Sequence, residues 1–176
     1  MIVGHRIRTY PEDEAALRIP AQRVQNVDSV RGVVEVLISM MRAFDGIGLA
    51  ATQVEDPSWA VQGWVQACPA MFVMAREDEN LVCINPEIVS TEGQLTKDEG
   101  CLSFASVVWP LAAPEVVRLR YMGLDGGTRE EVFDGWLARC AFHETDHLAG
   151  KLMIDRMARW ERRRFIRKVE AERRGK

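Results

Sequence analysis

The histidine pair in the segment HETDH is the feature that most restricts how this chain can fold. His143 and His147 are two of only three histidines among 176 residues. On an α-helix, residues four apart lie on one face, so both imidazoles reach a single metal ion if this segment is helical. Glu144 then lies where it can contact a water molecule on that ion. The sequence therefore predicts a metal-binding helix over about residues 135–149 that ends at Gly150.

Cys101 is the candidate for the third protein ligand that a catalytic metal site normally has. It follows Gly100 in a turn-like segment, and a cysteine binds a metal as its thiolate. A cysteine on its own is more often a buried packing residue, but the matched histidine pair favours a ligand here. The chain has four cysteines, too few for a disulfide scaffold. Cys68 and Cys83 are interpreted as packing residues, and Cys140 as part of the wall of the metal-binding helix.

The remaining pattern predicts an α+β fold. Apolar residues recur every three to four positions over residues 28–44, which predicts a helix with Asp28 or Ser29 as its N-cap. Short apolar runs separated by turn signals follow, and a basic helix begins near Asp155. We expect helices packed on a mostly antiparallel sheet, in one domain over residues 1–176. The expected strands are Trp59–Val65, Met71–Met74, Leu81–Ile84, Val116–Tyr121 and Glu130–Phe133.

Charge is distributed unevenly along the chain. Residues 157–176 hold nine Lys or Arg and three Glu, a net charge of +6, whereas the other 156 residues hold 14 basic and 23 acidic residues, a net charge of −9. Such a basic run is usually a solvated helix face, but it can also contact RNA phosphate. The chain has no long apolar run and no apolar signal segment near its start. We therefore expect a cytoplasmic protein with neither a membrane nor a DNA partner.

The segment GIGLAATQ at 46–53 offers a closely approachable backbone and the amide of Gln53. It lacks the glycine patterns of nucleotide-binding loops, which excludes that class of site. Together with EGCLS at 99–103 and HETDHLAG at 143–150, it resembles the three signature motifs of the peptide deformylases, in order and in spacing. The segments IRTYPEDEAALR and INPEIV resemble flanking segments of that family, so the resemblance extends to about residue 155.

The resemblance implies both an activity and a metal. The activity is hydrolytic removal of the N-formyl group from the N-terminal methionine of nascent peptides, with release of formate. The implied cofactor is one divalent ion, Fe(II), with Zn, Ni or Co as substitutes, held by Cys101, His143 and His147. The implied fold places antiparallel sheets around a central metal-binding helix, with further helices at the two ends of the chain.

The resemblance also implies roles for residues around the metal. Glu144 would be the general base and acid. Gln53 and the backbone N–H of Leu102 would stabilise the oxyanion. Backbone groups of Ile47 and Gly48 would hold the peptide substrate as an added strand. The other residues that the resemblance places at the substrate are Glu99, Trp136, Arg139 and Cys140.

The sequence departs from the family at positions that bear on the substrate. Ala105 stands where the family usually has proline, Phe142 where it usually has glutamine, and Arg139 where it usually has an apolar residue. Arg139 has two interpretations. In one, its stem covers the pocket wall and its guanidinium reaches water. In the other, it receives a carboxylate of the substrate. The stretch DPSWAVQGWVQACPA is longer than usual and is expected to form an extra loop or hairpin.

These departures leave two alternative functions open. One is a deformylase-fold amidohydrolase specialised for a small or acidic N-formyl substrate. The other is a non-catalytic, ribosome-associated binding protein. Bacterial members of the family dock a basic C-terminal helix on the ribosome, and the resemblance suggests the same contact for residues 155–176.

Overall fold

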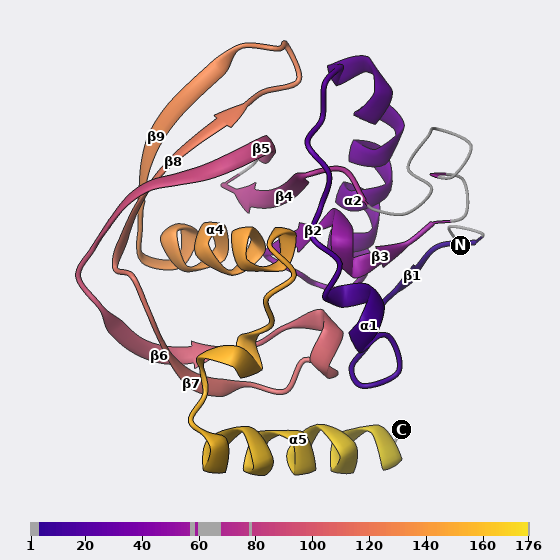
Figure 1. Cartoon of the computed structure of the whole chain (residues 1–176), viewed down its shortest axis with the longest axis vertical. Coiled ribbons are helices and arrows are strands. Elements are labelled where there is room, and N and C mark those ends of the chain that lie inside the picture. Colours follow the sequence, from indigo (N-terminus) through magenta and orange to yellow (C-terminus); the bar gives the residue numbers. More distant parts are fainter. Residues whose placement is uncertain (1–3, 57–58, 60–67, 78, 176) are drawn as a thin grey trace.

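The computed structural model describes residues 4–56, 59, 68–77 and 79–175 and has the expected α+β architecture (Figure 1). The strands and helices are β1 (Arg6–Ile7), α1 (Glu14–Leu17), α2 (Arg31–Ala43), β2 (Gly48–Ala50), β3 (Val54–Glu55), β4 (Met71–Arg76), β5 (Glu79–Glu92), β6 (Leu95–Glu99), β7 (Trp109–Ala113), β8 (Val116–Met122), β9 (Thr128–Asp134), α4 (Gly135–Leu148) and α5 (Arg159–Arg174). Short 3₁₀ turns are η1 (Val27–Val30), η2 (Ala51–Gln53), η3 (Leu102–Phe104) and η4 (Met153–Arg156). None of the helices in the described part of the chain has the length and apolar character needed to cross a lipid bilayer.

Helix α4 lies at the centre of the molecule, and strands enclose it from two sides (Figure 1). An antiparallel sheet with the strand order β2-β4-β5-β8-β9 curves around one side, and the antiparallel hairpin β6–β7 lies on the other. Register shifts between Ile84 and Glu87, and between Ile88 and Ser90, interrupt the pairing of β5 with β8. Such irregularities bend a strand, which lets the chain pass from the sheet into the hairpin. This arrangement around α4 supports our proposal of a single domain over residues 1–176.

The apolar face of α4 packs on the inner face of the sheet. Ala138, Ala141 and Leu148 share a buried cluster with Phe72 and Leu119 of the strands. Small side chains at two of these positions let the helix approach the sheet closely, and their burial excludes water from the helix centre. The predicted helix over 135–149 is therefore confirmed, and its position fixes the histidines inside the molecule.

Helix α2 packs on β2 and β4 through the apolar face that the sequence predicts. The prediction that Asp28 or Ser29 is the N-cap of this helix is wrong. Both residues lie inside the 3₁₀ turn η1, which precedes α2. The side chain of Asn26 caps that turn by accepting a hydrogen bond from the Asp28 N–H at 3.0 Å. The buried residues of α2 are Val33, Val34, Leu37, Met40 and Met41.

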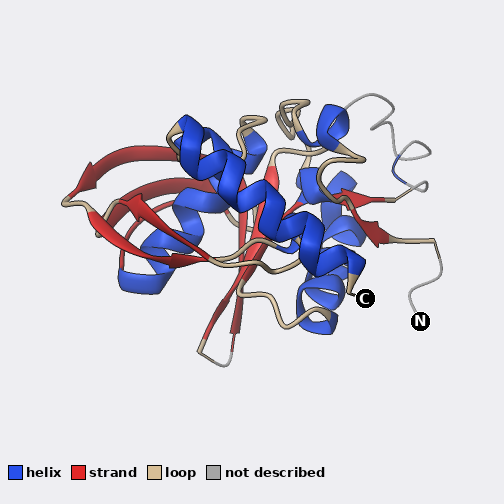
Figure 2. Ribbon diagram, turned by 90° about the horizontal axis from the view of Figure 1, so that it is seen from below, coloured by secondary structure: helices blue, strands red, loops and turns tan. Residues whose placement is uncertain are grey.

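Helix α5 runs along the outside of the molecule, against the hairpin β6–β7 (Figures 1 and 2). Phe165 is fully buried, with ring centroids 5.5 Å from Phe104 and 5.9 Å from Trp109. Val169 is buried in the same cluster. Trp160 does not join this cluster: 59% of it is exposed, and the Arg164 guanidinium lies 6.0 Å from its ring. The helix therefore docks through one short apolar stripe and leaves its basic face in solvent.

Four of the expected strands are confirmed as β4, β5, β8 and β9. The structure adds β1, β2, β3, β6 and β7, which the sequence signals did not indicate. Apart from Trp59, the expected strand Trp59–Val65 lies outside the described residues, as does much of the expected extra loop or hairpin.

Gly150 ends α4 in a backbone conformation with φ of +72°, and a Cβ there would lie 2.4 Å from the carbonyl oxygen of Arg18. We expect Gly150→Ala to lower the free energy of unfolding by about 2–3 kcal/mol, because left-handed strain and this contact add. Gly126→Ala is the matched control, since Gly126 has φ of +77° and open space around it. It should cost only about 1 kcal/mol. Urea denaturation measures both losses, and equal losses would contradict the role of the Arg18 contact.

Candidate metal centre and active site

Three buried side chains converge beside the middle of α4. The Nε2 atoms of His143 and His147 lie 3.1 Å apart, and Cys101 Sγ lies 3.3 Å from His147 Nε2. All three potential ligand atoms lie within 4.8 Å of one another. The two histidines come from successive turns of α4, and Cys101 comes from the segment that joins β6 to η3. The structure thus brings together the three residues that the sequence predicts as metal ligands.

This cluster fits a divalent ion. Nδ1 of His143 lies 2.7 Å from Glu99 Oε1, so Nε2 is the ring nitrogen available to a metal. Burial lowers the pKa of His147 well below its usual range, which keeps the ring in the neutral form that binds metals. At His143, burial is outweighed by Cys101 and Glu99, which raise its pKa, so metal binding there releases a proton. Two imidazoles and a thiolate suit zinc or iron.

Glu99 holds the metal-binding helix through a buried carboxylate. Arg139 Nη1 donates to its Oε2 at 2.9 Å, and Arg156 contacts both of its oxygens. Burial alone would raise the pKa of Glu99, but the hydrogen bond from His143 and the guanidinium of Arg156 hold it at about 2. Glu99 was expected to contact the substrate. Glu99 does line the cavity, but other side chains contact both of its oxygens, and Oε1 lies against Nδ1 of His143.

Arg139 matches neither interpretation that the sequence suggested. It is only 4% exposed, so its guanidinium does not reach out into water. Besides Glu99, its Nη atoms donate to the carbonyl oxygens of Leu111 at 3.0 Å and Leu95 at 2.6 Å. The carboxylate that Arg139 binds therefore belongs to the chain itself and not to a substrate.

Glu144 and Gln53 flank the cluster with groups suited to acid–base and hydrogen-bond chemistry. Burial raises the pKa of Glu144 to about 7, although His143 and the Ala50 N–H oppose the shift. Its Oε2 is buried without a hydrogen-bond partner among the described residues. The Gln53 amide is oriented because its Oε1 accepts from the Ala50 N–H at 3.0 Å. Its Nε2 then lies 3.4 Å from Cys101 Sγ.

A cavity of about 380 Å³ opens beside the cluster. Its wall includes every residue that the sequence analysis placed at the site except His147. Trp136 lines the cavity at its exposed rim, with 54% of the residue accessible to solvent. A Cβ on Gly48 would lie 2.5 Å from Cys140 Sγ, so only glycine lets β2 approach α4 this closely. The exposed apolar residues of the rim are Phe44, Ile47, Val108 and Trp136.

The structure also shows what sequence reasoning missed or left open. Arg156 was missed because it precedes a long basic run and resembles ordinary surface charge. Ala105 has φ of 55°, a conformation that proline cannot adopt, so the loop after Cys101 differs from one built around proline. Cys68 and Cys83 are buried free thiols outside the cavity wall, as predicted.

Glu144→Gln should stabilise the metal-free protein in a pH-dependent way. Because folding raises the pKa of Glu144 from 4.5 to about 7, the native state holds this proton more tightly, and its stability falls as pH rises through that window. We expect metal-free Glu144→Gln to exceed the metal-free wild type by about 3 kcal/mol at pH 8, with a several-fold smaller gain at pH 5. Thermal melts in a chelator measure the difference. A gain that does not depend on pH would contradict the burial of an ionisable group.

Comparison with known proteins agrees with this geometry. The family profile described as polypeptide deformylase matches residues 5–163. A peptide deformylase of Methylocella silvestris is 38% identical over 161 residues, which cover 88% of this chain and 78% of that relative. The solved peptide deformylase from Legionella pneumophila is 28% identical with a TM-score of 0.83, covering 98% of this chain and 96% of its own. The structure from Synechococcus elongatus, in complex with actinonin, is 34% identical with a TM-score of 0.80, covering 94% of this chain and 85% of its own. The chain therefore belongs to the polypeptide deformylase family.

Proposed function

We propose that the protein is a metal-dependent hydrolase that removes the N-formyl group from the N-terminal methionine of nascent peptides and releases formate. The observation that carries the proposal is the buried Cys101–His143–His147 cluster with Glu144 beside it, open to a cavity at one face. Membership of the family indicates which reaction is catalysed. The residues of this cluster have the functional groups that the reaction requires. The bond that is cleaved is the linear amide between the formyl group and the N-terminal nitrogen.

Cys101, His143 and His147 would hold one divalent ion, for which we propose Fe(II), with Zn, Ni or Co as substitutes. When bound, such an ion supplies Lewis acidity and an activated water. A thiolate and Fe(II) are both oxidisable, so activity should be lost in air.

Glu144 would take a proton from the attacking water and return it to the leaving amine. Its raised pKa of about 7 suits a group that both accepts and donates a proton near neutral pH. The Nε2 amide of Gln53 and the backbone N–H of Leu102 would donate to the oxygen that becomes negative as water adds to the formyl carbon. The hydrogen bond that orients Gln53 is already present, which reduces the reorganisation needed during the reaction.

Strand β2 would bind the peptide. It is the outermost strand of the described five-stranded sheet, and Ile47 and Gly48 line the cavity. A peptide can therefore add to its free edge through backbone hydrogen bonds. The apolar rim around Phe44 and Val108 suits an uncharged side chain such as that of methionine.

The two alternative functions have less support. Specialisation for an acidic formyl substrate was motivated by Arg139, whose guanidinium is bound internally. Asp45 and Asp98 at the cavity also oppose an acidic ligand. A binding protein without turnover would have no need of a buried Glu144 beside three potential ligands, with one oxygen that none of the described residues contacts by a hydrogen bond.

Formate release tests the proposed reaction. The protein is purified anaerobically with Fe(II) and given formyl-Met-Ala or a formylated acidic dipeptide. We expect rapid release from the first and slow release from the second. Glu144→Ala should keep its metal and lose about 10³-fold in turnover, because proton transfer is lost. Cys101→Ser should instead lose metal.

Three outcomes would contradict this assignment. Faster release from the acidic dipeptide would favour the specialised enzyme. No release by the metal-loaded wild type from either compound would favour a binding protein. Turnover near the wild-type level in Glu144→Ala would exclude Glu144 as the base.

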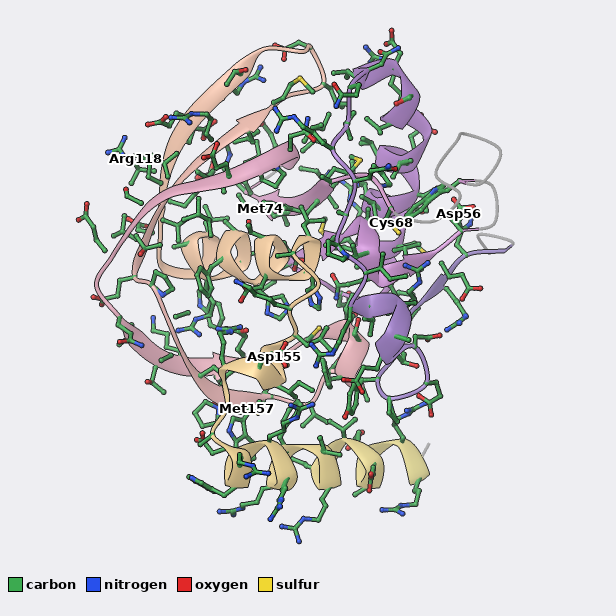
Figure 3. The ribbon with its side chains drawn as sticks, viewed as in Figure 1. Asp56, Cys68, Met74, Arg118, Asp155 and Met157 are labelled. Atoms are coloured by element: carbon green, nitrogen blue, oxygen red, sulfur yellow. The ribbon has the colours of Figure 1, made fainter. Side chains whose placement is uncertain are left out.

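We also propose that α5 contacts ribosomal RNA in the cytoplasm. Arg173 donates to the carbonyl oxygen of Tyr10 at 2.8 Å and helps to dock the helix, while other basic side chains extend from its outer face (Figure 3). A row of exposed cations on a docked helix is suited to phosphate. The exposed basic residues are Arg159, Arg163, Arg164, Arg167, Lys168 and Arg174.

Replacing Arg163, Arg164 and Arg167 together by Gln should weaken binding to ribosomes by about tenfold or more, because phosphate contacts are lost. Formate release should not change. The matched control replaces Arg118, Arg120 and Arg129 by Gln, which removes the same charge from β8 and β9. Arg118 points outward from the sheet in Figure 3. Co-sedimentation at fixed salt measures binding, and equal weakening in both variants would show only a dependence on net charge.

A further inference from the structure

We propose that Arg139 is a positioning residue for the metal centre: acting through Glu99, it fixes the ring of His143 and the end of β6 that carries Cys101. The proposal rests on the proposed function for its catalytic consequence, but its physical claim concerns metal binding. Under this proposal, Arg139 supports metal binding through Glu99 and does not bind the substrate.

The contacts of Arg139 tie α4 to both strands of the hairpin. Its Nη2 donates to the carbonyl oxygen of Leu95, the first residue of β6, at 2.6 Å. Its Nη1 donates at 3.0 Å to the carbonyl oxygen of Leu111 in β7, and at 2.9 Å to Oε2 of Glu99, the last residue of β6. One buried side chain of the helix thus contacts β6 at both ends and β7 near its middle.

The contacts that start from Arg139 lead through Glu99 back to α4, at His143. Arg139 and His143 are one turn apart on α4 and bind different oxygens of the Glu99 carboxylate, Oε2 at 2.9 Å and Oε1 at 2.7 Å. A carboxylate held on one oxygen cannot rotate freely, so its other oxygen fixes the plane of the imidazole. A partner of this kind behind a ligand histidine sets ring orientation and ligand basicity.

The same contacts place the cysteine ligand. Cys101 follows Glu99 by two residues at the end of β6, so any shift of this strand relative to α4 changes the separation of Cys101 Sγ from the two histidines. That separation is now 3.3 Å to His147. Arg139 therefore constrains the ligand from the hairpin as well as one from the helix.

A second arginine completes the enclosure of Glu99. Arg156, from η4, contacts both Glu99 oxygens and lies with its Cζ 5.4 Å from the ring centroid of Phe142. Arg139 and Phe142, two departures from the family pattern, therefore belong to one network around Glu99. We expect Arg156 to stay in place when Arg139 is replaced, so that the buried carboxylate keeps one cationic partner.

The test measures metal affinity directly. Wild type, Arg139→Gln and Arg139→Lys are loaded with Co(II), and dissociation constants are obtained by competition with a chelator. We expect about tenfold weaker Co(II) binding in Arg139→Gln, with altered visible absorption bands of the bound Co(II). Arg139→Lys should lose about threefold, since an ammonium keeps the charge at Glu99 but cannot reach all three acceptors. Arg120→Gln, which removes an ion pair on the outside of β8, should bind Co(II) like the wild type.

Kinetics separate this role from a substrate contact. With formyl-Met-Ala, Arg139→Gln should lower kcat and leave KM within about twofold. Unchanged Co(II) affinity together with a raised KM would overturn the proposal and assign Arg139 to the substrate. If Arg139→Gln does not fold, unchanged Co(II) affinity in Arg139→Lys overturns it equally. If the wild type binds Co(II) but releases no formate, the proposed function fails, while the Co(II) affinities still decide the role of Arg139.

Discussion

The buried hydrogen bond between Glu99 and His143 is the interaction on which the arrangement of the centre depends. An ionised carboxylate inside a protein is stable only when charged or polar partners surround it. Here an imidazole and two guanidiniums do so, and they come from α4 and from η4. The hairpin, the helix and the turn that follows it are thereby held at one point. The ligand from the hairpin meets the ligands from the helix because this point is fixed.

The site carries features that reduce stability. Glu144 is buried with an oxygen that has no hydrogen-bond partner in the described part of the chain, and two imidazole nitrogens lie 3.1 Å apart. Unpaired polar atoms in an interior disfavour folding. The apolar clusters around α2, beneath α4 and under α5 offset this cost. Such clustering of unfavourable groups is typical of sites arranged for binding or catalysis.

Much of the centre could be predicted from the sequence because its signals are local. The spacing of His143 and His147 favours a helix, and the apolar periodicity of residues 28–44 indicates α2. The contacts of Arg139 could not be predicted in this way. They depend on β6 and β7, whose sequences LTKDE and WPLAA lack the apolar alternation of a strand and include a proline. Arg156 was hidden for a related reason, since only the tertiary structure distinguishes it from the solvated arginines that follow.

Peptide binding at the edge of β2, as proposed, would determine the range of peptides that the enzyme can process. Backbone amides and carbonyls are common to all polypeptides, so a strand edge recognises a chain without reading most of its side chains. Discrimination is then concentrated at the cavity beside Gly48, where the formyl group and one side chain would enter. A single catalyst built in this way would serve newly made proteins of widely different sequence, with selectivity set chiefly at the first residue.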